Sequence, residues 1–446
     1  MADLPTTHRR SDVTIASMVA GGALALRLIP LSFGIESTDI LLYRQQAIPV
    51  VQGRNVYEVT QNVFPYTPVS MFYPALCLEL SRSLGIPFHV LVKLFAIGAD
   101  VAIAVALFVI GRKLVARRAA IRVAALYAVN PVSILVASFH GNIMPLVVLL
   151  MLCAYLLFRV DPDRNFAVSG LLLGLAVGWR SFPILLLPFF WAAIADRANK
   201  IRFALWVVVP PALSMVPFAW VAAAPMMREI LSYSGWGIHH GPFAVLRGLH
   251  LLSIGAITWA NPPEWAPWMS ASKLAFLGLY GIAVAFFSRT LGLSRGILVT
   301  LILFELIYSG VASQYLIWPL PMLLLERRAM FWCYEIAATY ALVVFYWIFF
   351  PDILFGALPA PGADLVTVLI QYLVSQAVFS AVCVAILVGI VARGTPSTTP
   401  AATAPAAGST PRTPHRLGLV GRLVCVYYAL LFAWEIAFAL SLGRSA

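Results

Sequence analysis

The stretch Ile35–Tyr73, IESTDILLYRQQAIPVVQGRNVYEVTQNVFPYTPVSMFY, decides how the rest of the chain is interpreted. It directly follows the first long apolar run, and it is polar although it holds four tyrosines. Glu36 and Asp39 lie at its start. A carboxylate at the mouth of a bundle of membrane helices is costly unless it has a function. We therefore predict that this stretch belongs to a large first outer loop, that Asp39 is a catalytic base, and that the other helices form a cup around it.

The composition predicts a membrane protein. Of the 446 residues, 61% are hydrophobic and only 11% are charged, whereas soluble domains carry roughly 25% charged residues. Apolar runs of about 20 residues, long enough to cross a bilayer as helices, recur along the sequence. The net charge of +12 does not indicate nucleic acid, because most basic residues lie in short loops where they set topology. The expected fold is an all-α polytopic membrane protein with about 13 transmembrane helices.

The basic clusters predict the topology. Arg9 and Arg10 place the N-terminus in the cytoplasm, and the segment GRKLVARRAAIR (111–122) is the densest basic cluster, which also belongs inside. The span His89–Ile110 then runs from outside to inside. The apolar piece Thr67–Leu84 must therefore stay in the first outer loop (34–88) as interfacial or re-entrant helices, which is tolerated where protein or a cavity covers them.

The same reasoning orders the remaining chain. The predicted spans are Val13–Phe33, His89–Ile110, Ala119–Ser138, Ile143–Phe158, Phe166–Val177, Phe182–Ala195, Phe203–Ala222, Met269–Phe287, Gly296–Tyr308, Leu316–Leu325, Phe331–Phe350, Leu365–Val391 and Leu417–Leu440. Residues 393–416 are rich in Pro, Thr and Ala and are expected to be a disordered cytoplasmic linker. We expect a catalytic transmembrane module at 1–325, additional helices at 326–392, this linker, and a last helix at 417–446.

Polar residues from separate loops converge on the outer face in this topology, as expected of a binding site on a scaffold. The candidate catalytic base is Asp39, and the candidate donor- or acceptor-binding residues are Glu36, Arg44, Tyr66, His140, Asn142, Arg180, His239, His240, Gln314 and Tyr315. Asp100 lies deep within a span and is expected to be structural, paired with a neighbouring helix.

A single carboxylate limits the chemistry. Classical glycosidases need two, because a sugar oxygen must be protonated to leave. If the donor is a sugar phosphate, only the acceptor hydroxyl needs a base, and the leaving anion needs a cation such as Arg44, Lys93 or Arg180. No GxxxxGKS or GxGxxG segment lies in a strand context, so no cytosolic nucleotide site is visible. This reasoning favours a lipid-phosphate sugar as donor.

Several short segments in order resemble a known family. They are GRNVY (53–57), PYTP (65–68), VKLFAIGAD (92–100), NP (130–131), FHGN (139–142), WRSFP (179–183) and ASQYLIW (312–318), after Asp39. Over about residues 13–325 the chain resembles GT-C glycosyltransferases. It is similar to the polyprenyl-phosphate-mannose-dependent mannosyltransferases of actinobacteria and to the GPI mannosyltransferase I catalytic subunit.

The resemblance implies a function. It implies an inverting transfer of a hexose, usually mannose, from a polyprenyl-phosphate donor to a lipid-linked or glycolipid acceptor on the extracytoplasmic face, with Asp39 as base. Those relatives usually carry an acidic residue near the place of Met144 and Lys at the place of Arg180. Arg keeps the charge, though with a planar fork geometry. The GPI enzyme has an Asp-x-Asp near the first helix, where this chain has Glu36 and Asp39.

Alternatives remain open at this stage. The chain could be a GT-C transferase that uses another lipid-phosphate sugar, such as arabinofuranose or glucose, or a non-catalytic GT-C-like scaffold or a transporter. Asp39 could instead have no role beyond capping a helix, since Ser37-Thr38-Asp39 precedes an apolar helical stretch. His239 and His240 lack a third ligand at suitable spacing, so no metal and no cofactor are expected. The expected partners are the lipid-linked donor, the acceptor and membrane lipids, without nucleic acid.

The expected location is a bacterial inner membrane. Only four residues are Lys, while Arg and Ala are abundant, which is typical of a GC-rich bacterial genome. The N-terminus is expected in the cytoplasm and the active site on the extracytoplasmic side.

Overall fold

The protein folds as a bundle of helices. The computed structural model describes residues 6–32, 35–60, 64, 66–232, 238–259, 261–355, 362 and 364–392, and every regular element in this part of the chain is helical. The α-helices are α1 (Thr6–Leu31), α2 (Thr38–Val51), α3 (Val56–Val59), α4 (Phe72–Leu84), α5 (Phe88–Val109), α6 (Arg117–Ala128), α7 (Pro131–Ile134), α8 (Met144–Val160), α9 (Pro162–Trp179), α10 (Leu187–Ala193), α11 (Arg197–Ser232), α12 (Pro242–Ile254), α13 (Ala266–Ile307), α14 (Leu320–Glu326), α15 (Arg328–Phe349), α16 (Pro351–Phe355) and α17 (Leu365–Ala392). The predicted all-α class is confirmed.

Short turns of tighter or wider helix join these elements. The 3-10 turns are η1 (Pro68–Ser70), η2 (Gly111–Lys113), η4 (Phe182–Leu186), η5 (Pro263–Trp265) and η6 (Ser313–Ile317). One turn, η3 (Leu135–His140), is a π-helix. Single π-turns often occur at functional sites, and η3 ends beside the cavity described below.

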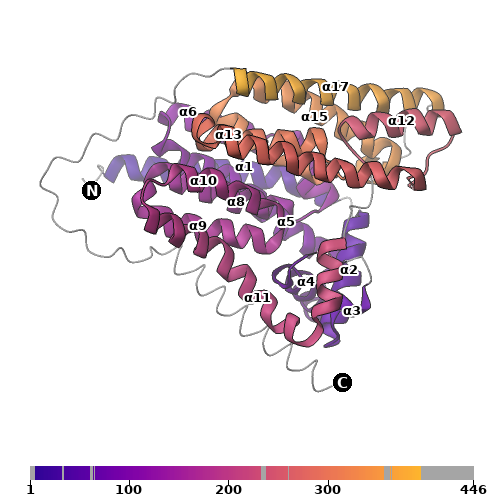
Figure 1. Ribbon diagram of the computed structural model, residues 1–446, viewed down its shortest axis with the longest axis horizontal. Coiled ribbons are helices and arrows are strands. Elements are labelled where there is room, and N and C mark those ends of the chain that lie inside the picture. Colours follow the sequence, from indigo (N-terminus) through magenta and orange to yellow (C-terminus); the bar gives the residue numbers. More distant parts are fainter. Residues whose placement is uncertain are drawn as a thin grey trace, which may run out of the picture.

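The helices form two groups joined by a central set (Figure 1). Helices α12, α15 and α17 pack together on one side, and α8 and α9 pack on the other, with α11 running along α9. Helix α5 contacts α1, α6 and α8 and so lies in the centre. The hairpin of α2 and α4 stands at the end of the bundle near the far half of α11 (Figure 1).

Glycine allows α9 and α11 to approach closely. A Cβ atom on Gly174 would lie 2.6 Å from the carbonyl oxygen of Trp206 and 2.7 Å from that of Val207. Gly170, one turn earlier, meets Trp206 Cβ and the Phe203 carbonyl at 3.0 Å in the same way. Small residues at such contacts let helix backbones pack in a membrane, where lipid offers no hydrophobic driving force.

A buried ion pair ties the first helix to the centre of the bundle. Arg27 Nε lies 2.6 Å from Asp100 Oδ2, and both side chains have no exposed surface. The Arg27 guanidinium also donates to the Ala128 carbonyl and to Ser133 Oγ, each at 2.7 Å, and the Tyr127 hydroxyl donates to Asp100 Oδ1. This confirms the prediction that Asp100 is structural and pairs with a neighbouring helix.

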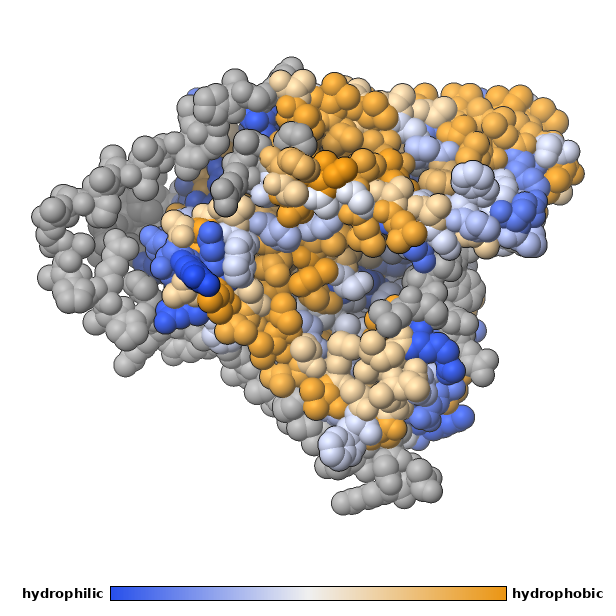
Figure 2. Space-filling view, viewed as in Figure 1, coloured by the Kyte–Doolittle hydropathy of each residue, from blue (hydrophilic) through white to orange (hydrophobic). Residues whose placement is uncertain are grey.

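Fewer helices meet the requirements for a membrane span than predicted. By length and composition six described helices qualify, within Ser11–Leu31, Phe88–Lys113, Arg197–Ile230, Pro263–Phe286, Arg328–Phe349 and Leu365–Ala392. A seventh results if the bent pair Arg117–Ala128 and Pro131–His140 is one span. The chain is therefore a polytopic membrane protein, and the number 13 stays a prediction. Figure 2 shows largely apolar helix faces, with hydrophilic side chains gathered toward the ends of the bundle.

Two physical reasons explain the difference. Several predicted spans form shorter helices, such as the 17-residue α8 and the 7-residue α10. The predicted spans Met269–Phe287 and Gly296–Tyr308 lie on either side of a kink in α13 at Gly292, whose φ of +69° favours glycine, and only the first of them qualifies as a membrane span. The predicted linker 393–416 and the span Leu417–Leu440 lie outside the described residues.

Candidate functional site

A cavity of about 300 Å³ lies where the α2 end of the bundle meets α15. Its wall combines hydroxyl, amide, imidazole and aromatic side chains from segments far apart in sequence: Thr38, Asp39, Leu42, Tyr43, Gln46, Tyr66, His140, Asn142, His239, Trp259, Tyr308, Gly310, Ala312, Ser313, Gln314, Tyr315, Phe345 and Phe350. Its size suits the polar headgroup of a lipid or another small molecule.

Asp39 reaches this cavity from the first turn of α2. The N-cap of that helix is Ser37, whose Oγ accepts a hydrogen bond from the backbone N–H of Ile40 at 3.3 Å. Asp39 is therefore not the cap, and a carboxylate in the first helical turn is favoured by the helix dipole. The Ser37 hydroxyl also donates to the carbonyl oxygen of His140, which fixes the start of α2 against η3.

The π-turn η3 brings two polar side chains to Asp39. The chain leaves η3 through Gly141, whose φ of +77° lies in the left-handed region. A Cβ atom on Gly141 would lie 2.8 Å from Lys93 Cγ and 2.9 Å from Ile40 Cδ1. The backbone N–H groups of Gly141 and Asn142 both donate to the carbonyl of Val136. A residue without a side chain is thus required between His140 and Asn142.

Two donors hold the Asp39 carboxylate. His140 Nε2 lies 2.7 Å from Asp39 Oδ2, and Asn142 Nδ2 donates to the same oxygen at 2.5 Å. Among the described residues nothing donates to Asp39 Oδ1, and the side chain is 23% exposed, so this second oxygen is open to the cavity.

These contacts favour the ionised form of Asp39. Burial alone raises the pKa of Asp39, but the charge that His140 carries when protonated, the hydrogen bonds from His140 and Asn142, and the nearby Arg180 outweigh it. The pKa is lowered from 3.8 to about 2. Asp39 is therefore an anion at any physiological pH and a weak base.

Arg180 lies behind the cavity wall rather than in it. Its Nη1 donates to the Trp179 carbonyl at 2.9 Å, and its Cζ lies 3.7 Å from the centre of the Tyr66 ring, which lines the cavity. No carboxylate in the described part of the chain forms an ion pair with it. The guanidinium therefore contributes positive potential behind Tyr66.

The opposite wall is aromatic. The His239 ring lies 4.9 Å from that of Phe345 and 6.0 Å from that of Trp259, and Trp259 packs at 4.8 Å against Phe350. Burial and then the nearby Arg247 hold the pKa of His239 well below its usual value, so His239 is a neutral ring. Trp259 is 44% exposed, so this wall continues to the outer surface of the molecule.

The predicted site residues divide into two groups. The structure brings Asp39, Tyr66, His140, Asn142, His239, Gln314 and Tyr315 to the cavity. Glu36 and Arg44 do not line it, because Arg44 Nη2 pairs with Glu36 Oε1 at 2.8 Å, with His89 at 3.2 Å from the same oxygen. His240 is fully buried behind the wall, where its Nε2 lies 3.0 Å from Ser313 Oγ.

Sequence reasoning missed several residues of the wall. Tyr43 and Gln46 lie within the opening stretch, and Ser313 lies within the quoted segment ASQYLIW, so these could have been named. Phe345 and Phe350 could not, because aromatic residues in an apolar helix look the same whether they face lipid, core or cavity.

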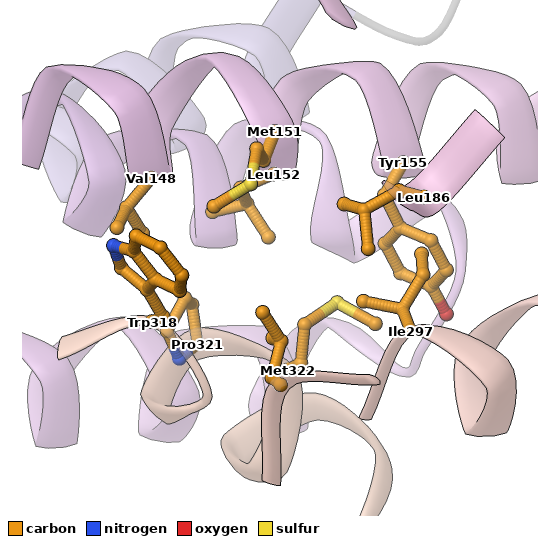
Figure 3. Close-up of a pocket in the computed structure, with 10 residues that line it drawn as sticks. Val148, Met151, Leu152, Tyr155, Leu186, Ile297, Trp318, Pro321 and Met322 are labelled. Atoms are coloured by element: carbon orange, nitrogen blue, oxygen red, sulfur yellow. The ribbon is translucent and has the colours of Figure 1, made fainter. Parts of the chain in front are cut away.

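A second pocket is too small for a ligand. It measures about 20 Å³, room for about one water. It lies between α8 and α14, with Val148 and Trp318 at one end and Tyr155 and Leu186 at the other (Figure 3). Within the described ranges, no three His, Cys, Asp or Glu side chains gather where they could hold a metal ion.

Comparison with known families changes the functional interpretation. Residues 46–246, slightly less than half of the chain, match the family described as GPI transamidase subunit PIG-U. No curated protein matches the chain. The matched range holds Tyr66, His140 and Asn142, and it ends before α13 and η6.

The match corrects two predictions. PIG-U is described as a subunit of GPI transamidase, not as a glycosyltransferase. The prediction of an enzyme that transfers mannose or another hexose from a polyprenyl phosphate, with Asp39 as its base, is therefore wrong. The ordered motifs misled because each is short. The alternative of a non-catalytic scaffold agrees better with the match.

Proposed function

We propose that the protein is a non-catalytic membrane subunit whose cavity binds the polar headgroup of a glycolipid. The observation that carries this proposal is the cavity itself, with a carboxylate fixed at one end and an aromatic wall at the other. Sugar hydroxyl groups suit a carboxylate acceptor, and flat apolar rings suit the faces of a sugar. The similarity to a GPI transamidase subunit supports a role within a larger assembly that handles a glycolipid.

The state of Asp39 favours binding over catalysis. A general base works best with a pKa near the operating pH, and that of Asp39 is about 2. Such a carboxylate accepts hydrogen bonds without taking the proton.

The lipid tail has an exit past Trp259. This residue lines the cavity and is also exposed. Nearby apolar side chains, Ile254 at 47% and Ile257 at 42% exposure, extend the surface outward. We propose that the headgroup occupies the cavity while the chains stay in the bilayer. In this arrangement the cavity faces the extracytoplasmic side, and the basic ends of α5 and α6 face the cytoplasm.

Native mass spectrometry in nanodiscs tests the proposal. The probe is glucosaminyl-phosphatidylinositol in a phosphatidylcholine bilayer, and phosphatidic acid serves as the comparison lipid. We expect saturable retention of the glycosylated lipid and none of phosphatidic acid. Trp259→Ala should weaken retention about tenfold or more, as expected for a contact residue of this kind. The matched control is Trp220→Ala, since Trp220 is 90% exposed on α11. Equal retention of both lipids, or equal effects of both substitutions, would contradict the proposal.

A further inference from the structure

Five polar side chains lie one behind another from the Asp39 carboxylate into the bundle, in the order His140, Tyr346, Ser313, His240 and Gln376, with hydrogen bonds between His140 and Tyr346 and between Ser313 and His240. We call these residues the donor chain. They come from η3, α15, η6, the turn before α12, and α17. All five are buried, and only His140 and Ser313 belong to the cavity wall.

The contacts of the donor chain are short. His140 Nδ1 lies 3.0 Å from the Tyr346 hydroxyl, and Ser313 lies beside that hydroxyl. Ser313 Oγ lies 3.0 Å from His240 Nε2. Beyond it, the Gln376 amide interacts with His240, although His240 Nδ1 and both amide atoms lack a hydrogen bond of normal geometry.

The ionised carboxylate sets the direction of the hydrogen bonds. Asp39 can only accept, so His140 must place its proton on Nε2, and Nδ1 becomes an acceptor for the Tyr346 hydroxyl. The Ser313 oxygen accepts from His240 Nε2–H, so the hydroxyl hydrogen of Ser313 can turn toward the Tyr346 oxygen beside it. His240 Nδ1 has no hydrogen-bond partner in the described part of the chain. A neutral His240 agrees with its burial, which lowers its pKa to about 3.

We propose that the donor chain holds Asp39 with Oδ1 open to the cavity as a pure hydrogen-bond acceptor, so that this point selects ligand groups carrying an O–H or N–H. His140 uses its Nε2 hydrogen and Asn142 uses one amide hydrogen to bind Oδ2, and the open Oδ1 shares the negative charge of the carboxylate. A phosphate or a carbonyl oxygen is therefore rejected there. This inference rests on the proposed function and specifies which ligand group meets Asp39.

The tautomers can be measured without any ligand. The chain has seven histidines, and ¹⁵N magic-angle-spinning spectra of histidine-labelled protein distinguish the tautomers, with His140→Gln and His240→Gln used for assignment. We expect Nε2 to carry a proton in both residues, and Nδ1 of His140 to carry none. Tyr346→Phe should leave the proton of His140 on Nε2, where Asp39 holds it, and should shift the Nδ1 resonance, because Nδ1 loses its hydrogen bond. The matched control Tyr127→Phe removes a buried hydroxyl that bonds Asp100, and it should leave His140 unchanged. A doubly protonated His140, or a proton on Nδ1, would overturn the inference.

Lipid competition tests the selectivity. Phosphatidylethanolamine and phosphatidylcholine differ at the ammonium group, which carries N–H donors only in the former. We expect phosphatidylethanolamine or phosphatidylinositol to displace glucosaminyl-phosphatidylinositol. Displacement by phosphatidylethanolamine indicates that an ammonium group meets Asp39, and displacement by phosphatidylinositol indicates that a hydroxyl does. If phosphatidylcholine displaces the probe as strongly as these two lipids, the inference is contradicted.

Two substitutions separate this inference from the proposed function. Asp39→Asn should weaken retention of the glycosylated lipid about tenfold, because a charge-assisted hydrogen bond is lost. Tyr346→Phe should weaken it roughly threefold, since one neutral hydrogen bond is lost, while retention in the Tyr127→Phe control stays at the wild-type level. If wild type binds the lipid but neither Asp39→Asn nor Tyr346→Phe weakens retention, the inference fails and the proposed function stands. If wild type retains no glycolipid while the tautomers are as expected, the proposed function fails.

Discussion

Asn142 donates a hydrogen bond to Asp39 Oδ2 over 2.5 Å, although 103 positions separate the two residues. The same side chain accepts the backbone N–H of Met144 at 2.8 Å through its Oδ1. The Asn142 side chain thus provides an acceptor for the first backbone N–H of α8 and at the same time orients the Asp39 carboxylate. Both folding stability and ligand binding therefore depend on Asn142, and a matched control variant can separate the two effects.

We predict that Asn142→Leu reduces both stability and glycolipid retention. Loss of the two hydrogen bonds leaves the backbone N–H of Met144 without a partner and Asp39 Oδ2 with His140 alone, which costs about 1–3 kcal/mol. The control is Asn165→Leu, because Asn165 Nδ2 donates to the Leu157 carbonyl at 2.9 Å, far from the cavity in sequence and outside its wall. Thermal melting in detergent should fall for both variants. Lipid retention measured by native mass spectrometry should fall only for Asn142→Leu, and an equal loss in both would make its role structural alone.

The pH dependence of stability should carry the signature of Asp39. Its pKa in the folded protein, about 2, lies below the reference value of 3.8, so the ionised form stabilises the fold. This contribution is fully present above about pH 4 and is lost as the pH falls toward 2, with a total on the order of 2 kcal/mol. The melting temperatures of wild type and Asp39→Asn should therefore differ by a constant amount between pH 5 and 8 and converge in acid. If the two melting temperatures already converge near pH 6, the Asp39 carboxylate is not held by His140 and Asn142 in the way that the structure shows.

The buried pair of Arg27 and Asp100 should be costly to break on one side. Arg27→Met leaves an unpaired carboxylate in the bundle, which costs about 3–5 kcal/mol. The double variant Arg27→Met with Asp100→Leu removes both charges and should recover much of this loss. Urea or thermal unfolding monitored by circular dichroism measures wild type, the single variants Arg27→Met and Asp100→Leu, and the double variant. A double variant that loses more stability than the two single variants together would contradict this account.

Gly174 should tolerate no larger residue. In Gly174→Ala the new methyl group meets two backbone carbonyls of α11 within 2.7 Å, and backbone cannot move aside as a flexible side chain can. We expect a clear fall in melting temperature. Gly98→Ala is the control, since Gly98 lies within α5 and a Cβ there meets nothing within 4 Å. That variant should be neutral or slightly stabilised, because alanine favours helix.

The long apolar helices could be predicted from the sequence. The predicted spans His89–Ile110 and Phe331–Phe350 agree with α5 and α15 to within three residues at each end, because sustained hydropathy determines them. The π-turn at Leu135–His140 could not be predicted, since its sequence has the same pattern as the ordinary helix before it. The break at Gly292 agrees with the predicted gap between the spans Met269–Phe287 and Gly296–Tyr308.

Much of the cavity wall was named from polar residues in predicted outer loops. Asp39, His140 and Asn142 were found because polar groups are rare in this chain and their position needs a reason. Of the donor chain beyond His140, only His240 was named. Tyr346 and Gln376 lie within apolar helices, and only the packing of α15 against α17 shows where they point. The chemistry was misassigned for a related reason. Whether a carboxylate serves as a base depends on its hydrogen-bond partners, and Asn142 and His140 meet Asp39 only in three dimensions.

The residues of the cavity wall are spread along the sequence from Thr38 to Phe350, and this spread has a consequence for biosynthesis. The chain is made and inserted from its N-terminus, so α2 reaches the membrane long before α15 has been translated. Throughout that interval the Asp39 carboxylate lacks the aromatic wall, and after η3 has formed it still lacks Tyr346 behind His140. A nascent chain that stops before α15 therefore exposes an incomplete cavity, with the charged Asp39 carboxylate in it, to the lipid. We expect this intermediate, and not the finished bundle, to be what membrane chaperones and proteases recognise.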